Sequence, residues 1–272
     1  MRKILITGAA GGIGGRLRQE FRGRYALRLS DIKPIADLAA GEEFMPADMA
    51  DQAAVARAVR GVDGIVHLGA FSVEGPWEVI LPANVVGTYN LFEAARQAAV
   101  KRIIFASSNH AVGFYPRDLT IDHGVYPKPD SRYGVSKVFG EALGSLYADK
   151  YGAEVMCIRI GNAEVRPLDV RRLSIWISPR DLAQLIGIGL DHPEIRFEIV
   201  YGMSDNKRAW WDNSNALRLG YRPQDRSEDY AAEVLAQHAA ATGNVLADAM
   251  QGGAFVSAEA GGDPAKPAGN AR

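Results

Sequence analysis

A tyrosine and a lysine four residues apart, Tyr133 and Lys137, stand at the start of a predicted helix. That spacing places both side chains on one face of the helix, one turn apart. A free tyrosine, with a pKa of about 10, is a poor base at neutral pH. A neighbouring ammonium group and a bound cationic ring both favour the phenolate, so this pair is suited to acid–base catalysis. An isolated pair of this kind, however, is usually an exposed pair on an ordinary helix.

Polar residues follow the strand predicted over residues 102–107, in the run Ser107-Ser108-Asn109-His110. The carboxyl ends of strands are where open α/β sheets bind ligands. A hydroxyl at Ser108 could hydrogen-bond a reacting oxygen beside the tyrosine. Taken alone, Ser108 is equally a turn or cap residue, and His110 is better explained as a structural histidine.

A glycine-rich turn, Gly8-Ala9-Ala10-Gly11-Gly12-Ile13-Gly14, follows the first predicted strand and opens a helix. Gly8 permits a tight turn, Gly11 lets the backbone approach a pyrophosphate, and Gly14 allows close helix–strand packing. The helix N-terminus offers free N–H groups to phosphates. Asp31 closes the second predicted strand, near the offset at which a carboxylate binds an adenosine ribose. The combination predicts a dinucleotide site. Asp48, ahead of the helix predicted over residues 51–60, could face the adenine or cap a helix.

Short apolar runs that alternate with helical patterns must position these residues. The predicted strands are residues 3–7, 26–30, 64–68, 102–107, 155–160 and 197–201. The predicted helices are residues 12–22, 51–60, 83–98, 133–150 and a helix capped by Ser178 that runs to about residue 190. Continuously apolar strands are typical of a parallel sheet covered on both faces. The pattern therefore predicts an α/β fold with a doubly wound parallel sheet, a Rossmann fold.

The chain divides into three predicted segments. Residues 1–160 form the dinucleotide-binding core, residues 161–255 a smaller substrate-binding lobe, and residues 256–272 a flexible tail rich in Gly, Ala and Pro. Among 272 residues, 31 Lys and Arg balance 32 Asp and Glu, which argues against a nucleic-acid partner. The single cysteine, Cys157, excludes a disulfide framework and a cysteine-based zinc site. Without a membrane-spanning run or a signal peptide, the expected location is the cytoplasm.

Together these features resemble the extended short-chain dehydrogenase/reductase superfamily. The matching residues are Thr7-Gly8-x-x-Gly11-x-x-Gly14, Asp31, Ser108, Tyr133-x-x-x-Lys137, His67-Leu68-Gly69-Ala70 and Asn84-Val85-Val86-Gly87-Thr88. The resemblance implies NAD as cofactor, Tyr133 as the catalytic acid/base, Lys137 as the residue that holds the nicotinamide ribose, and Ser108 as the group that polarises the substrate. The implied cofactor-binding residues are Gly8, Gly11, Gly12, Ile13, Gly14, Asp31, Ile32, Asp48, Met49, Leu68, Gly69, Ala70, Asn84, Tyr133, Lys137 and Ile160.

A narrower resemblance, to the bacterial uronate dehydrogenases, extends to about Phe255. It rests on residues 67–74, 107–110, 171–176, 201–202 and 210–214. It implies that the sugar contacts Ser72, Ser108, Asn109, His110 and Asn162, and that Arg171 binds the carboxylate. Asn162 departs from the family, where a serine is expected, although an amide can still donate a hydrogen bond. A guanidinium can bind a carboxylate through two parallel hydrogen bonds, but composition alone favours an exposed surface role for Arg171.

The resemblance implies NAD-dependent oxidation of the anomeric carbon of a hexuronic acid, D-glucuronate or D-galacturonate, to an aldarolactone. An alternative is a nucleotide-sugar epimerase or dehydratase, although little chain remains after Ile160 for the usual larger lobe. A third is a non-catalytic dinucleotide-binding protein, which would not need Ser108, Tyr133 and Lys137. The expected protein is a homo-oligomer that acts on a small molecule and has no metal, nucleic-acid or membrane partner.

Overall fold

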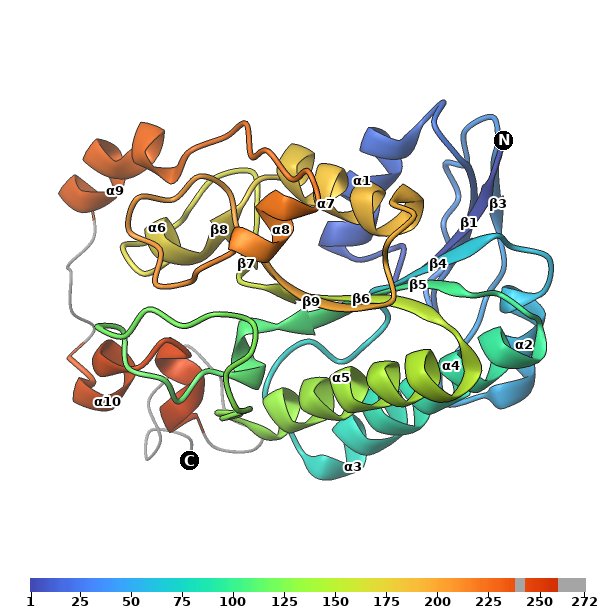
Figure 1. Cartoon of the computed structure of the whole chain (residues 1–272), viewed down its shortest axis with the longest axis horizontal. Helices are drawn as coiled ribbons and strands as arrows, with labels where there is room; N and C mark the ends of the chain where they lie inside the picture. The colour runs from blue at the N-terminus through green and yellow to red at the C-terminus, as the bar shows by residue number, and fades with distance from the viewer. Residues whose placement is uncertain (238–242, 259–272) are drawn as a thin grey trace.

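A single seven-stranded sheet runs through the middle of the molecule (Figure 1). The computed structural model describes residues 1–237 and 243–258. All neighbouring strands are parallel, in the order β3-β2-β1-β4-β5-β6-β9. The strands are β1 (Lys3–Thr7), β2 (Ala26–Ser30), β3 (Glu42–Phe44), β4 (Gly64–His67), β5 (Arg102–Ser108), β6 (Glu154–Ile160) and β9 (Phe197–Gly202). The predicted strand bounds are each correct to within one residue. The doubly wound α/β fold is confirmed.

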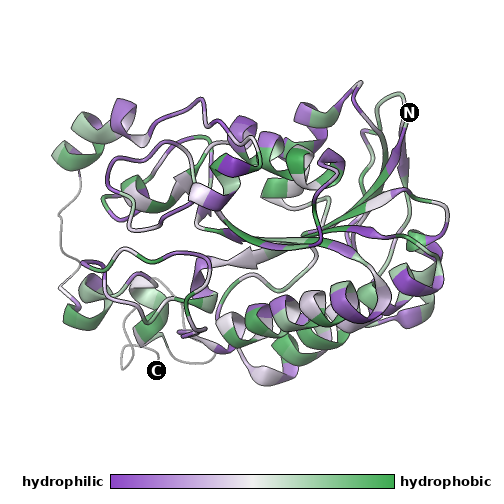
Figure 2. Cartoon of the chain, viewed as in Figure 1, coloured by the Kyte–Doolittle hydropathy of each residue, from purple (hydrophilic) through white to green (hydrophobic). Residues whose placement is uncertain are grey.

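Helices cover both faces of this sheet (Figure 1). One face is covered by α2 (Gln52–Val59), α4 (Gly87–Gln97) and α5 (Arg132–Tyr151), and the other by α1 (Gly12–Phe21) and α7 (Pro179–Asp191). Each face has its own buried apolar core, one around Phe92 and Leu143 and the other around Phe21 and Leu185. Figure 2 shows hydrophobic residues along the central strands, whereas α5 alternates between hydrophobic and hydrophilic residues.

Side chains cap several helices where the sequence predicts them to start. Asp51 accepts hydrogen bonds from two backbone N–H groups at the start of α2. Ser131 accepts from Gly134 N at 2.9 Å ahead of α5, and Ser178 accepts from Asp181 N at 3.1 Å ahead of α7. At the other end of α5, Gly152 adopts a left-handed conformation (φ 67°) that ends the helix. These caps fix the first turn of α5, which carries Tyr133.

The helix predicted over residues 83–98 differs from the structure. The helical path begins earlier, with α3 (Trp77–Ile80), widens into a π-helical segment (Leu81–Val86), and only then becomes α4. Pro82 has no N–H group and its ring crowds the preceding turn, so regular α-helical bonding is interrupted there. Wider π turns of this kind often occur at functional sites. Asn84 lies within this segment.

Smaller elements lie beyond β6. They are β7 (Asn162–Ala163), β8 (Trp176–Ile177), α6 (Arg172–Ile175), α8 (Ser214–Arg218), α9 (Ala231–Gln237), α10 (Val245–Ala249) and two 3-10 helices (Ser227–Tyr230 and Gly253–Ser257). Because β9 and α7 belong to the main sheet and its cover, the segment 161–255 also builds the core. The division at residue 160 stays a prediction. Of the predicted flexible tail, Val256 is buried, and residues 259–272 lie outside the described residues.

Candidate active site

An open cavity of about 470 Å³ lies at the carboxyl ends of β1, β2 and β4. This is the point where the strand order reverses direction, the usual ligand site of a doubly wound sheet. Its lining includes these predicted cofactor residues: Gly8, Gly11, Gly12, Ile13, Gly14, Asp31, Ile32, Asp48, Met49, Leu68, Gly69 and Ala70. The structure therefore brings these predicted residues together in one cleft, and their contact with the cofactor stays a prediction.

The glycine turn has the geometry of a phosphate cradle. Gly8 adopts φ 66°, and a Cβ on Gly14 would lie 2.6 Å from the Gly8 carbonyl oxygen. No side chain caps the start of α1, and its first turn carries no acidic residue. The backbone N–H groups at the start of the helix therefore face the cavity with the positive end of the helix dipole. These features fit a dinucleotide pyrophosphate.

Two backbone N–H groups hold the Asp31 carboxylate at the rim of this cavity. Its Oδ2 accepts from Ala10 N at 3.0 Å, and its Oδ1 accepts from Lys33 N at 2.9 Å. Lone pairs on both oxygens remain for the hydroxyls of a ribose.

Asn84 differs from the other predicted cofactor residues, because it lines neither this cavity nor the adjoining one. Its buried amide instead bonds both backbone groups of Phe71 and donates to Ser136 Oγ at 3.0 Å.

A second open cavity of about 480 Å³ continues from the first and contains the predicted catalytic residues. Ser108 is the last residue of β5, whereas Tyr133 and Lys137 lie near the start of α5, which packs against β5. Lys137 Nζ lies 5.4 Å from the centre of the Tyr133 ring and donates to the Ala106 carbonyl at 2.8 Å. All three side chains are buried.

Burial sets the protonation of this group in the ligand-free protein. Burial raises the pKa of Tyr133 to about 12, although a hydrogen bond with Ser108 acts in the opposite direction. Burial also lowers the pKa of Lys137 to about 8. Without a bound cofactor the net pKa of Tyr133 is therefore raised, because desolvation of the phenol outweighs the hydrogen bond that favours the phenolate. A further positive charge beside the phenol is needed to favour the phenolate.

The lining of the second cavity also includes residues that the sequence predicted to face a substrate. His110 Nδ1 donates to Asp130 Oδ2 at 2.7 Å, and its ring stacks on Phe255 with centroids 3.7 Å apart. Ser72, exposed, lines both cavities. Asn162 lines the second cavity, and its buried Oδ1 has no hydrogen-bond partner among the described residues. A buried amide oxygen without a partner is costly, and a hydroxyl donor at this position would remove that cost.

Arg171 lines the same cavity and is only partly exposed, so the expectation of a freely exposed surface arginine is wrong. Its Nε and Nη2 donate to the Gln251 carbonyl at 3.0 and 2.7 Å. With the Asn109 amide oriented to donate to the Ile160 carbonyl, the Asn109 oxygen accepts from Arg171 Nη2 at 3.0 Å. Burial, together with the charge of Arg117, lowers the pKa of Arg171 to about 10. It remains a cation at neutral pH.

Residues 4–173 match the model of a known family, described as the NAD dependent epimerase/dehydratase family. The chain belongs to this family. It is 49% identical to a uronate dehydrogenase of Pseudomonas putida, over 94% of this chain and 96% of the relative. A glucuronic acid dehydrogenase of Chromohalobacter salexigens superimposes with a TM-score of 0.92 at 44% identity, covering 95% of this chain and 97% of that one. A mutant uronate dehydrogenase of Agrobacterium tumefaciens, complexed with NAD, also gives 0.92, at 41% identity over 95% and 98% of the chains.

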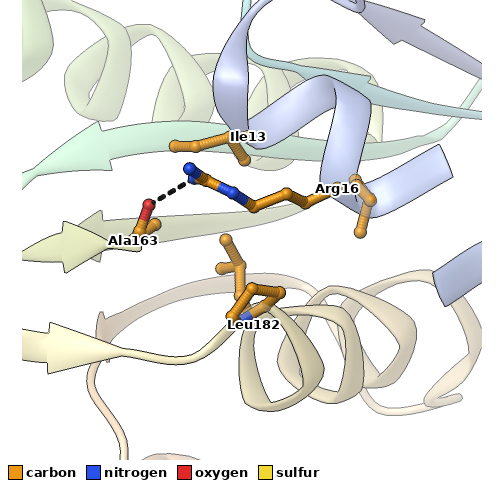
Figure 3. A pocket seen from close by; sticks show the side chains of 6 residues that line it. Ile13, Arg16, Ala163 and Leu182 are labelled. Carbon is orange, nitrogen blue, oxygen red and sulfur yellow. Dashed lines mark hydrogen bonds between the residues drawn. The ribbon is translucent and has the colours of Figure 1, made fainter. Parts of the chain in front are cut away.

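In this member of the epimerase/dehydratase family, one side chain joins the glycine turn to the segment after β6. Arg16 of α1 donates to the Ala163 carbonyl at 2.9 Å and pairs with Glu164 at 2.5 Å. Figure 3 shows Arg16 reaching from α1 to Ala163, above Leu182 of α7. Arg16 also lines the second cavity. Arg16 therefore links α1 to the segment after β6, and no sequence pattern singled it out.

Other residues behind the site were also missed. Glu74 is buried and accepts from Tyr133 N at 3.1 Å and from Arg132 Nη1 at 2.9 Å, so it holds the start of α5. Asp130 was missed because nothing in its local sequence indicates that it faces His110.

Among residues 1–237 and 243–258, no group of three His, Cys, Asp or Glu side chains is arranged to hold a metal ion. In the same residues, no helix is long and apolar enough to cross a membrane.

Proposed function

We propose that the protein is an NAD-dependent uronate dehydrogenase, which oxidises the anomeric carbon of D-glucuronate and D-galacturonate to the aldarolactone. The observation that carries this proposal is a cationic Arg171 in the same cavity as Ser108, Tyr133 and Lys137. An arginine suits a carboxylate because its planar fork can form two parallel hydrogen bonds. The activities named for the similar proteins support the same substrate class.

The chain's own residues suggest how the reaction proceeds. NAD supplies the nicotinamide ring that accepts a hydride when it is bound. Arg171 binds the carboxylate and orients the sugar ring, while Ser108 hydrogen-bonds the C1 oxygen. The Tyr133 phenolate takes the proton of the C1 hydroxyl, and the ammonium of Lys137 stabilises that phenolate. Only the cyclic sugar carries both a hydroxyl and a hydrogen on C1 without added water, so the product is a lactone.

A substrate panel tests the proposal directly. Purified protein with NAD is given D-glucuronate, D-galacturonate, D-glucose, D-galactose and UDP-sugars, and NADH is followed by absorbance. We expect rapid reduction of NAD with the two uronates, little with the neutral sugars, and a lactone as the first product by NMR. Equal turnover of glucose and glucuronate contradicts the proposal. Conversion of a UDP-sugar without net NADH supports a nucleotide-sugar epimerase instead.

Asp31 is expected to favour NAD over NADP. Its carboxylate, fixed by Ala10 N and Lys33 N, would lie against the additional phosphate of NADP with like charge. The Asp31→Ala variant should lower the NAD/NADP ratio of kcat/KM by about tenfold, or about 1.4 kcal/mol, mainly by improved use of NADP. Steady-state kinetics with both cofactors measures this ratio. Asp63→Ala, which removes an acid far from the cavity, is the control. A ratio of one in the unmodified protein contradicts the assignment.

We further propose that the protein is cytoplasmic and forms a homo-oligomer with a second copy of the chain. Support for the oligomer comes from α4 and α5, which lie side by side (Figure 1). Tyr89, Val135 and Leu146 are each 46–48% exposed on these helices. Patches of exposed apolar residues often mark protein interfaces. Light scattering of the purified protein measures the assembly, and a monomer at micromolar concentration contradicts this proposal.

A further inference from the structure

Neutral groups, not carboxylates, hold the Arg171 guanidinium in place. Its contacts are the Gln251 carbonyl at 2.7 and 3.0 Å and the Asn109 amide oxygen at 3.0 Å. Among residues 1–237 and 243–258, no acidic side chain forms an ion pair with Arg171. A carboxylate partner would neutralise the cation. Carbonyl partners orient it and leave its charge available to a ligand.

Gln251, which supplies that carbonyl, is itself fully buried and fully bonded. Its Nε2 donates to the carbonyls of Pro116 and Leu119, both at 3.0 Å. Its Oε1 accepts from Trp211 Nε1 at 2.9 Å. Its backbone N–H donates to the Tyr115 carbonyl at 2.9 Å. These bonds attach Gln251 to a loop and to a buried tryptophan, so the position of its carbonyl is set by the folded protein.

The two glycines that follow bring the backbone into direct contact with the polar wall of the cavity. A Cβ on Gly252 would lie 1.9 Å from Asp130 Oδ2, the oxygen that accepts from His110. Gly253 adopts φ 64°, and a Cβ there would lie 2.6 Å from Arg171 Nε. Only a backbone without side chains can pass this closely. The segment is therefore packed against both Arg171 and the His110–Asp130 pair.

We propose that Gln251 is a positioning residue that fixes the direction of the Arg171 guanidinium and thereby sets the preference for a sugar that carries a carboxylate. The inference rests on the proposed uronate dehydrogenase function. An arginine side chain loses much conformational freedom when it binds a ligand. Because the bonds from Gln251 order Arg171 during folding, a uronate meets a guanidinium that is already oriented. Without the bonds of Gln251, Arg171 keeps its charge, but its guanidinium is no longer held in one orientation.

The test compares Gln251→Met with the unmodified protein, using D-glucuronate and NAD. We expect KM for glucuronate to rise by about tenfold, which corresponds to about 1.4 kcal/mol, with a smaller fall in kcat and unchanged NAD affinity. In an Arg171→Ala background, Gln251→Met should change kcat/KM for glucuronate by less than about twofold. No guanidinium is then left to position, and the effects of two coupled residues are not additive in free energy. Asn215→Leu, which removes another buried amide bonded to the Ile199 carbonyl at 2.7 Å, is the matched control.

Three outcomes separate the possibilities. An unchanged glucuronate KM in folded Gln251→Met overturns the inference while the proposed function stands. If the fold-losses of kcat/KM in the two single variants multiply in the double variant, the inference is also overturned, because Gln251 then acts independently of Arg171. No uronate turnover by the unmodified protein contradicts the proposed function itself. If Gln251→Met fails to bind NAD, Gln251→Glu replaces it. Glutamate keeps the size and the acceptor for Trp211 but cannot donate to Pro116 and Leu119.

Discussion

Replacing Tyr133 with phenylalanine should lower kcat for D-glucuronate by at least about 10²–10⁴-fold, the range typical of losing a general base. The ring remains to fill its place in the cavity wall, but the oxygen that receives the C1 proton is gone. The glycine turn and Asp31 are untouched, so the affinity for NAD should not change. Single-turnover kinetics together with NAD titration by fluorescence separates these two effects.

Tyr147→Phe provides a matched control for that experiment. Tyr147 lies on the same helix, is buried, and donates to Glu93 Oε2 at 3.0 Å, but it lines neither cavity. Removing its hydroxyl should change stability by about 0.5–1.5 kcal/mol, as for a typical hydrogen bond, and leave kcat unaltered. Near-normal turnover in Tyr133→Phe would assign the proton transfer elsewhere, and His110 is then the first residue to test.

Replacing Arg171 with alanine should lower kcat/KM for D-glucuronate by about 10²–10³-fold, since truncating one partner of a buried charged pair costs about 2–5 kcal/mol. Both KM and kcat should suffer, because the carboxylate loses its partner and C1 loses its orientation. The slow oxidation of D-glucose should change little, as that sugar has no carboxylate to bind. Steady-state kinetics with both sugars gives the ratio of kcat/KM for glucuronate to kcat/KM for glucose.

Two variants define the role of charge at this position. Arg171→Lys keeps the cation but loses the planar fork, so it should fall between the unmodified protein and the alanine variant. Arg180→Ala removes an exposed arginine that pairs with Asp225 at 2.6 Å, and it should behave like the unmodified protein. If Arg171→Ala slows glucose and glucuronate equally, the arginine supports the fold and does not select the substrate.

The cofactor half of the site was predictable from sequence because its determinants are local. The glycine spacing, the acid at Asp31 and the apolar strands each act within a few residues, and parallel strands bring their carboxyl ends together. Tyr133 and Lys137 lie one helical turn apart, but that spacing alone does not indicate a site, and their predicted role came from the other motifs and the family resemblance. The matched substrate residues from Ser72 to Arg171 line the second cavity, although which of them contact the sugar stays a prediction.

The residues that support the substrate wall could not be found in this way. Gln251 lies 80 residues from Arg171 in the chain, and no motif or periodic spacing in the sequence connects the two residues. Asp130 lies 20 residues after His110 in the chain, and no periodic spacing indicates that the two side chains are in contact. The π-helical turn was missed because Pro82 suggests a break and gives no sign that the helix continues through it. The high pKa of Tyr133 depends on burial, which no local pattern reveals.

The position of Gln251, Gly252 and Gly253 in the chain has a consequence for biosynthesis. The ribosome completes every strand of the main sheet before it adds these residues, because β9 ends at Gly202. Amino-terminal parts of a chain generally fold first during synthesis. A nascent chain can thus acquire its dinucleotide cleft while Arg171 still lacks the Gln251 carbonyl. If Gln251 positions Arg171 as proposed, the substrate site is complete only after residues 251–253 have been made and have packed against Arg171.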